Sequence, residues 1–191
     1  MSRQTKKSYV TPEEYLAFER AAEYKNEYFD GEIVAMTGAS QKHVLITGNI
    51  AAELRAQLRG RPCETYPSEM RVRIPSANLY TYPDVVVACG TPEFEDAEVD
   101  TLLNPVLIVE VLSKSTSSYD RGAKFDYYRS TLPSLEEYLL VEQNEYHVVQ
   151  YVRQQDGRWL LADIRGADGR VELPSVECVL TLSDVYERVE M

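Results

Sequence analysis

The sequence predicts a mixed β-sheet flanked by helices, which is an α/β or α+β fold. Two short runs rich in β-branched residues, 82–88 and 105–112, are typical of buried strands. Other segments have the apolar spacing of amphipathic helices and alternate with the strand-like runs. No repeat or linker divides the 191 residues, so we expect one domain over 1–191, with 1–9 as a flexible N-terminal segment.

The elements are expected in a clear order along the chain. A helix should begin after Thr11, because Thr11 can act as N-cap, Pro12 suits the first helical position and Glu14 completes a capping box. This helix should end near Ala22. The other expected elements are a hairpin in 26–36 turning at Asp30-Gly31, a helix at 43–58, strands at 63–74 and 82–88 joined by a loop at 75–78, a central strand at 105–112, a polar turn at 113–118, a helix at 119–130, a strand at 137–141, a hairpin of 146–152 and 159–164, and a short terminal helix capped by Ser183.

The net charge of −11 counts against nucleic-acid binding as a default. The charge is uneven, however. Five arginines and two acids lie between Arg55 and Arg73, whereas 93–100 is strongly acidic and should form a solvated loop. Two alternatives for the surface therefore remain. It either has a locally basic groove built by Arg55, Arg59, Arg71 and Arg73, or it is acidic throughout.

Cysteine usage and hydropathy favour a cytoplasmic protein without a membrane segment. Cys63, Cys89 and Cys178 lie far apart without metal-ligand spacing, so we expect reduced structural thiols. No apolar run approaches the roughly 18–20 residues that cross a bilayer, and no apolar signal segment follows the basic start. The 14 tyrosines indicate self-association, because tyrosine packs well at interfaces.

The main candidates for chemistry are two acids on the two apolar runs, Asp84 and Glu110. A buried carboxylate is costly unless it is paired, and Glu110 interrupts a run of seven apolar residues. If the two strands are neighbours, both carboxylates can converge on one Mg²⁺ or Mn²⁺, ions that prefer oxygen ligands. The backbone carbonyl of Val111 is a further candidate ligand. For Asp84 alone, the simpler interpretation is a residue at a strand start whose carboxylate meets solvent or a backbone amide.

A lysine is the third candidate member of this site. Lys124 lies on the helix after the second run and shares a helical face with Asp120. Its ammonium would orient the attacking water and stabilise transition-state charge, although a surface lysine paired with Asp120 is a common alternative. Lys114 lies closer to Glu110 in sequence, but a polar turn ends the strand before it, so we favour Lys124.

Three further residues are weaker candidates for a role in the chemistry. Glu27 is either an additional metal ligand or an exposed strand residue. His43 opens a helix and is interpreted as a capping or solvated histidine, with phosphate contact or acid–base chemistry as the alternative. His147 is interpreted as structural. The chain has no G-x-S-x-G elbow and no Gly-rich phosphate loop, and two histidines with scattered cysteines argue against a zinc site or a Cys–His nucleophile.

An ordered set of motifs resembles a known family. Pro83-Asp84 followed by Glu110-Val111-Leu112-Ser113 resembles the PD-(D/E)XK nuclease superfamily. Further motifs resemble the Uma family of restriction-like endonucleases over roughly residues 10–188. These motifs are Tyr28-Phe29-Asp30-Gly31-Glu32, Tyr82-Pro83-Asp84-Val85, Pro105 with Ile108 to Thr116, Asp120-Arg121-Gly122-Ala123-Lys124, and Pro133 to Tyr138 with Val141.

The resemblance implies a restriction-endonuclease-like α/β core with a central mixed β-sheet flanked by helices. It also implies Mg²⁺-dependent phosphodiester cleavage with Asp84 and Glu110 as metal ligands. The chain departs from the superfamily motif at Leu112, where a lysine is expected two residues after the glutamate. Lys124 matches the helix lysine that takes its place in this family.

Two functions are therefore expected as alternatives. The first is a Mg²⁺- or Mn²⁺-dependent endonuclease acting on DNA, with Asp84, Glu110 and Lys124 in the site and Glu27 assisting. The second is a non-cleaving binding or regulatory module with the same fold, expected as a homodimer and motivated by the acidic charge and by Leu112. A homodimer also fits the first function, because double-strand cleavage needs two sites.

Overall fold

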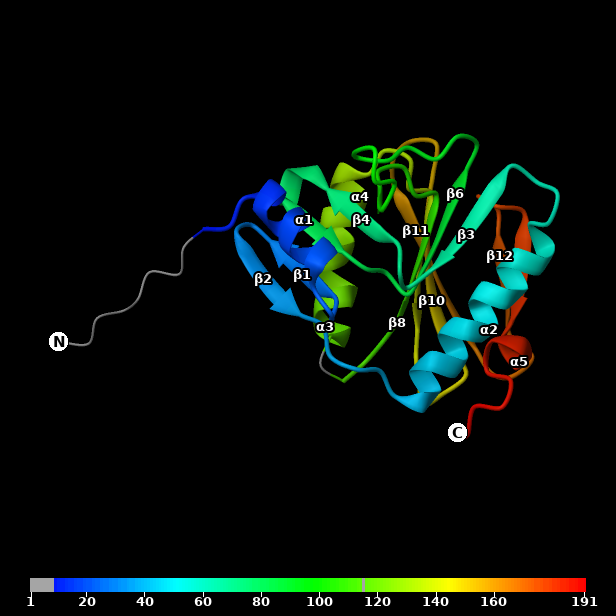
Figure 1. The fold of residues 1–191 in the computed structure, drawn as a ribbon. Coiled ribbons are helices and arrows are strands. Elements are labelled where there is room, and N and C mark those ends of the chain that lie inside the picture. The colour runs from blue at the N-terminus through cyan, green and yellow to red at the C-terminus, as the bar shows by residue number, and fades with distance from the viewer. Residues whose placement is uncertain (1–8, 115) are drawn as a thin grey trace.

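The computed structural model describes residues 9–114 and 116–191, and it places a central mixed sheet between two layers (Figure 1). The central sheet has six strands in the order β11-β10-β9-β8-β6-β3, and only β8 and β9 run parallel. The predicted fold class is thus confirmed. The strands are β3 (Cys63–Pro67), β6 (Val85–Cys89), β8 (Leu107–Val111), β9 (Glu137–Val141), β10 (His147–Arg153) and β11 (Trp159–Arg165).

A second sheet and a separate hairpin complete the β structure. The second sheet has the strand order β2-β1-β5-β4-β7, and β12 pairs with β13 on its own. The strands are β1 (Asn26–Phe29), β2 (Glu32–Ala35), β4 (Arg71–Ile74), β5 (Leu79–Thr81), β7 (Thr101–Leu102), β12 (Arg170–Leu173) and β13 (Cys178–Thr181).

The helices lie on both sides of the central sheet, with α2 on one side and α4 on the other (Figure 1). Between α3 and α4 the chain forms one π-helical turn, Asp120–Lys124, so the predicted helix at 119–130 contains an irregular turn. The helices are α1 (Pro12–Ala21), α2 (Gln41–Gln57), α3 (Ser117–Tyr119), α4 (Phe125–Thr131) and α5 (Leu182–Val185), with a 3₁₀ turn at Pro75–Ala77.

Side-chain alternation along the central strands divides the core into two clusters. Val109 and Leu139 face α2 and α5, whereas Ile108 and Leu140 face α4 and the second sheet. Residues i and i+2 of a strand share a face, so Glu110 lies on the same face as Ile108. The most apolar strand thus directs its one acid toward α4. A third, smaller cluster of Tyr15, Leu16, Tyr28 and Tyr80 joins α1 to the second sheet.

Local sequence signals account for the helix starts. Thr11 and Glu14 form the predicted capping box of α1. The cap of α2 is Ser40, whose hydroxyl accepts a hydrogen bond from the backbone of His43, so this helix begins slightly earlier than predicted. The predicted cap of the terminal helix is wrong: Thr181 caps α5, and Ser183 lies inside the helix.

The predicted strand at 63–74 is also incorrect, because the chain changes sheets within it. Pro67 ends β3, and a turn at 68–70 leads into β4 in the second sheet. Proline has no N–H and cannot continue a strand ladder, which explains the break. The hairpin of β12 and β13 is not among the elements predicted from the sequence.

The predicted reduced state of the three cysteines is wrong for two of them. Cys63 and Cys89 form a disulfide, with Cα atoms 4.0 Å apart. The antiparallel register of β3 and β6 places them directly opposite each other, although 26 residues separate them in sequence. Cys178 is free and buried.

The N-terminal prediction falls largely on residues outside the described part of the chain. Residues 1–8 are not described, whereas Tyr9 donates a hydrogen bond to Asp30 at 3.2 Å and accepts one from Asn78 at 2.9 Å. Within 9–114 and 116–191, none of the helices combines the length and apolar character needed to cross a membrane.

Candidate active site

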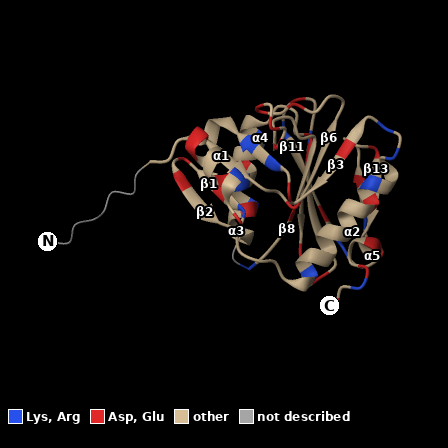
Figure 2. Cartoon of the chain, viewed as in Figure 1, with Lys and Arg blue, Asp and Glu red and all other residues tan. Residues whose placement is uncertain are grey.

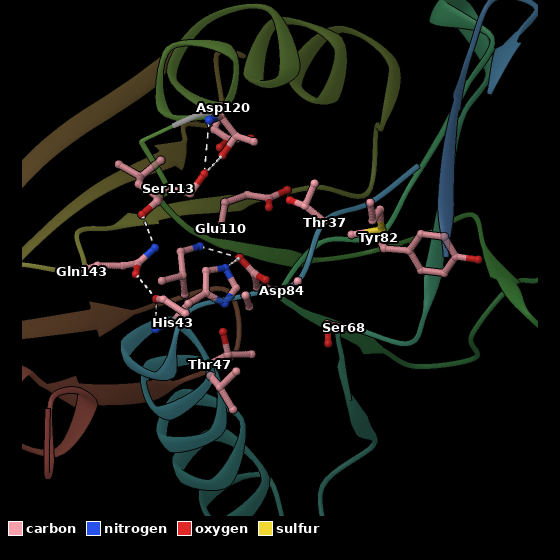
Figure 3. Close-up of a pocket in the computed structure, with 18 of the residues that line it drawn as sticks. Thr37, His43, Thr47, Ser68, Tyr82, Asp84, Glu110, Ser113, Asp120 and Gln143 are labelled. Carbon is pink, nitrogen blue, oxygen red and sulfur yellow. Dashed lines mark hydrogen bonds and ion pairs between the residues drawn. The ribbon is translucent and has the colours of Figure 1, made fainter. Parts of the chain in front are cut away.

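A cleft of about 1250 Å³ opens between the two sheets, at the N-terminus of α2. Its floor is formed where β6 begins and β8 ends, and the π-helical turn closes one side. Figure 3 shows side chains from these separate elements pointing into the same space. All four carboxylates discussed below line this cleft: Glu27, Asp84, Glu110 and Asp120.

Asp84 and Glu110 are cross-strand neighbours. The register of β6 and β8 pairs Val85 with Val109, and its continuation by one residue places Asp84 opposite Glu110. Opposed residues in an antiparallel pair have Cβ atoms about 4.5–5.5 Å apart. Asp84 Oδ2 also accepts a hydrogen bond from the backbone N–H of Val111 at 2.7 Å. The two acids predicted from the sequence therefore lie side by side.

His43 contacts the same oxygen of the Asp84 carboxylate. Its Nε2 lies 3.2 Å from Asp84 Oδ2, and both side chains are largely buried. Burial alone would lower the pKa of His43, but the hydrogen bond and charge of Asp84, with the backbone of Val111, raise it overall. The Val111 N–H points toward Asp84, and the N–H and C=O of one residue in a strand point to the same side, so the Val111 carbonyl also faces the site. The interpretation of His43 as a capping or solvated residue is wrong.

Glu110 is almost completely buried, with 4% of its surface exposed. Its Oε1 accepts a hydrogen bond from the hydroxyl of Tyr128 at 2.9 Å and lies 2.8 Å from Lys124 Nζ. Burial raises the pKa of Glu110 to about 8; the Lys124 ammonium opposes this rise, and Asp120 and Asp84 add to it. Such a group gains a proton readily and releases it when a cation binds.

The π-helical turn places Lys124 next to the Glu110 carboxylate. Lys124 Nζ also lies 3.6 Å from Asp120 and 3.8 Å from Glu27, and only 6% of its side chain is exposed. Burial would lower the pKa of Lys124, but the carboxylates of Glu110, Glu27 and Asp120 raise it well above its usual value. Lys124 is therefore an ammonium ion surrounded by acids.

The two candidate lysines occupy different places. β8 ends at Val111, and Lys114 follows it as an exposed residue at the lining of the cleft. No contact joins Lys114 to Glu110 in the described part of the chain, whereas Lys124 contacts Glu110 directly. The geometry agrees with the preference for Lys124 in the sequence.

Two residues near Lys124 on its helix, Asp120 and Tyr128, belong to this cluster but were not assigned to the site from the sequence. Asp120 is 4% exposed, and burial raises its pKa, against the effect of Lys124. Tyr128 is fully buried and holds Glu110. Their spacing of four residues on either side of Lys124 was the available signal, but the same spacing is common in surface ion pairs.

Glu27 lies at the edge of the cluster. It is on β1, its side chain is 24% exposed, and it accepts a hydrogen bond from the Thr81 hydroxyl. The two halves of the site therefore come from the two sheets, because Glu27 is supplied by the second sheet and Glu110 by the central sheet.

The predicted arginine groove does not form. Arg71 is 3% exposed and pairs with Asp100, and Arg73 pairs with Glu95, so both are neutralised by the segment predicted to be a solvated loop. Arg55 and Arg59 lie instead at the end of α2, beside a different hollow. Figure 2 shows basic residues interleaved with acidic ones over these elements.

The donor set of the cleft fits a hard divalent cation. Asp84, Glu110 and the Val111 carbonyl offer oxygen atoms from adjacent strands, and Glu27 offers a further carboxylate. At the cluster itself the four acids meet Lys124 and His43, whereas Lys25, Lys42 and Lys114 also line the cleft. The gathering of carboxylates around Lys124 is a physical reason for a cation to bind here.

Comparison with known proteins identifies relatives of the chain. The model of the Uma2 family, described as "Putative restriction endonuclease", matches residues 12–183. Two proteins of Synechocystis sp. (strain ATCC 27184 / PCC 6803 / Kazusa) are similar. "Uncharacterized protein sll1609" is 39% identical over 163 residues, covering 85% of this chain and 92% of the relative, and "Uncharacterized protein slr1290" is 37% identical over 177 residues, covering 93% and 91%.

A solved structure has a similar fold. It is described as a "putative nuclease belonging to DUF820" from Anabaena variabilis ATCC 29413. The two structures have a TM-score of 0.75 at 20% sequence identity, over 95% of this chain and 99% of the other. The likeness supports the restriction-endonuclease-like architecture predicted from the motifs.

Proposed function

The chain belongs to the Uma2 family, and from this membership and the geometry of the cleft we propose that it is a Mg²⁺- or Mn²⁺-dependent DNA endonuclease. The observation that carries the proposal is the contact between Lys124 and Glu110 at 2.8 Å, beside Asp84 on the adjacent strand. Buried titratable groups that cluster in a cleft are typical of catalytic sites.

Each residue has a defined role in this proposal. Asp84, Glu110 and the Val111 carbonyl hold the metal ion, and Glu27 adds a ligand from the second sheet. The metal ion would supply Lewis-acid charge to the scissile phosphate and lower the pKa of its bound water. His43 and the Val111 N–H fix the orientation of the Asp84 carboxylate.

Lys124 acts on the attacking water and on the phosphate. Its ammonium donates hydrogen bonds in a nearly water-free part of the cleft, where they are stronger than at the surface. It orients the water for in-line attack on phosphorus and stabilises the negative charge that develops as the P–O bond to the leaving group breaks. Asp120 and Glu27 keep Lys124 charged and in position.

The cations that would meet the nucleic-acid backbone lie at the cleft rather than in an arginine groove. Lys114, which is exposed, and Lys42, which is partly exposed, both line it. Phosphate contacts by such lysines make binding weaken as salt concentration rises. The net charge of −11 then opposes non-specific binding elsewhere on the protein.

The test is cleavage of plasmid DNA and of RNA by purified wild type and Asp84→Ala, with Mg²⁺, with Mn²⁺ and with a chelator. We expect metal-dependent cleavage of DNA that Asp84→Ala removes. A matched control is Asp156→Ala, which alters an exposed acid paired with Arg158 and should leave cleavage unchanged.

Two outcomes of this test would contradict the proposal. Cleavage that survives Asp84→Ala would show that the assignment of Asp84 to the active site is wrong. Absence of cleavage by a folded wild type on every substrate would favour the alternative function, a non-cleaving binding or regulatory protein. The oligomeric state, for which we propose a homodimer, is measured on the same samples by light scattering.

A further inference from the structure

The turn between β9 and β10 carries a second cluster of potential metal ligands, outside the active-site cleft. Glu142, Glu145 and His147 each offer one ligand atom, and these atoms lie within 4.8 Å of one another. No other group of three histidines, cysteines or acids is so compact among residues 9–114 and 116–191. The carboxylates of the cleft, by contrast, are spaced around Lys124.

His147 is buried in a way that points to a ligand. Only 6% of its side chain is exposed, and among the described residues neither ring nitrogen makes a hydrogen bond of good geometry, although carboxylate oxygens of Glu145 and Asp163 lie 3.4 Å and 3.2 Å away. Burying an imidazole without hydrogen bonds costs free energy. Its Nδ1 faces Glu145 Oε1 at 3.4 Å, on the side of the glutamates. A metal ion bound between them would satisfy this nitrogen.

The opposite nitrogen has the partner that a metal-bound histidine usually has. Nε2 lies 3.2 Å from Asp163 Oδ1, on the adjacent strand β11. Metal-ligating histidines commonly donate their other ring N–H to a carboxylate, which fixes the tautomer and the ring orientation. Asp163 would thus orient His147 while Nδ1 binds the ion.

The backbone of the turn is already held in place. The backbone N–H of Glu142 donates a hydrogen bond to the carbonyl of His147 at 3.0 Å. The Tyr186 hydroxyl lies within donor distance of two carbonyl oxygens, that of Glu142 at 2.8 Å and that of His147 at 3.0 Å. Only the glutamate side chains have to close on a metal ion. Preorganised ligands of this kind lose little conformational entropy on binding.

The surrounding charges leave room for a cation. Arg121 pairs with Glu142, and Arg165 pairs with both Glu145 and Asp163. Three carboxylates therefore face two guanidinium groups, which leaves one more negative than positive charge among these five side chains. The Arg165 side chain is 55% exposed, and exposed ion pairs of this kind contribute little stability.

We propose that Glu142, Glu145 and His147 bind a divalent transition-metal ion of the Zn²⁺ class. One imidazole nitrogen and two carboxylates match the ligand preference of Zn²⁺, with a fourth position left for water. The oxygen-rich cleft instead suits Mg²⁺ or Mn²⁺. The proposal is independent of the nuclease function, because it uses none of the residues of the cleft.

The site lies next to the cleft through Gln143 of the same turn. Gln143 accepts a hydrogen bond from Ser40 at 2.6 Å and donates one to the Leu112 carbonyl at 2.7 Å. Figure 3 shows Gln143 beside the start of α2, where His43 lies. A metal ion that fixes this turn would also fix the contacts that hold the N-terminus of α2 against β8.

The chain has two histidines, which makes the test direct. Zn²⁺ is titrated into full-length protein with ¹⁵N-labelled histidine, and the imidazole signals are followed by NMR. We expect the His147 signals to shift and saturate at one Zn²⁺ per chain in Glu110→Gln, a variant that disables the cleft. His43 serves as the internal control and should not move at this first equivalent.

Calorimetry with Zn²⁺ on variants completes the test. We expect Glu145→Gln, which alters an exposed side chain and should fold normally, to weaken binding at least tenfold. Asp163→Asn should weaken it by about 10-fold to 100-fold, the usual effect of losing such a carboxylate. Unchanged His147 signals at millimolar Zn²⁺, or equal Zn²⁺ affinity in Glu145→Gln and wild type, would overturn the proposal.

Discussion

The two faces of β8 are packed in opposite ways. Toward α2 and α5 the strand presents Leu107, Val109 and Val111, which join a cluster made almost entirely of aliphatic side chains. Toward α4 it presents Ile108 and then Glu110, which meets Lys124 in the buried part of the cleft. One face therefore stabilises the fold through apolar burial, whereas the other carries a costly buried charge cluster.

This difference separates a face of β8 that serves stability from a face that stability alone does not explain. Buried acids can often be replaced by apolar residues without loss of stability, so their presence calls for another reason. On the α4 face that reason is the proposed chemistry. The predictions below separate the two faces, since a change on one should affect stability and a change on the other should affect cleavage.

The largest effect on stability is expected for Leu139→Ala on the α2 face. Leu139 is fully buried and pairs with Val109 across the β8–β9 ladder. Deleting most of its side chain leaves a cavity, so the free energy of unfolding should fall by about 2–5 kcal/mol. Urea denaturation measures this change. Loss of cleavage in the folded variant would show that the faces are not independent.

Lys124→Met should lower cleavage more than stability, the opposite of what is expected for Leu139→Ala. Removal of the ammonium takes away a donor that stabilises transition-state charge, so cleavage should fall by about 10²-fold to 10³-fold. Cleavage rates at saturating metal are compared with those of Lys114→Met, the exposed alternative, which should retain most activity. Circular dichroism establishes that both variants are folded. Full activity in Lys124→Met would rule out its proposed role.

A smaller effect is expected from buried charges that serve structure alone. Asp100 pairs with Arg20 at 2.8 Å and with the buried Arg71, and these contacts hold the pKa of Asp100 well below its usual value despite partial burial. Asp100→Asn should lower the free energy of unfolding by about 1–3 kcal/mol at neutral pH, less than for a fully buried pair.

The pH dependence of this effect has a definite sign. Because the folded-state pKa of Asp100 is depressed, its contribution is present above the unfolded value near 4 and is lost as pH falls below it. Wild type should therefore lose more stability than Asp100→Asn between about pH 5 and pH 2. Parallel acid denaturation curves for the two proteins would contradict the ion-pair interpretation.

Much of the fold was predictable from the sequence because local signals agreed with tertiary packing. The capping box at Thr11, the turn at Asp30-Gly31 and the apolar strand β8 are all where their patterns indicate. The change of sheet after Pro67 was not predictable in detail, because a single strand pattern does not reveal which partner strand each part will meet.

Long-range geometry also limited prediction of the site. The neighbouring positions of Asp84 and Glu110 follow from strand register and were expected once the strands were assumed to be adjacent. The Cys63–Cys89 pairing depends on the register of β3 and β6, and the contact of His43 with Asp84 depends on how α2 crosses the sheet. Local sequence patterns determine neither the register of two paired strands nor the way in which a helix crosses the sheet.

The central claim is that Glu110 is a metal ligand, and Mn²⁺ titration calorimetry tests it most directly. The titration is made in the Glu145→Gln background, so that the cluster on the β9–β10 turn does not contribute heat. Glu110→Gln is compared with Glu136→Gln, which alters an exposed acid next to β9. We predict one Mn²⁺ site in the Glu136→Gln protein and at least tenfold weaker binding in the Glu110→Gln protein. Equal Mn²⁺ binding by the two proteins would contradict the claim.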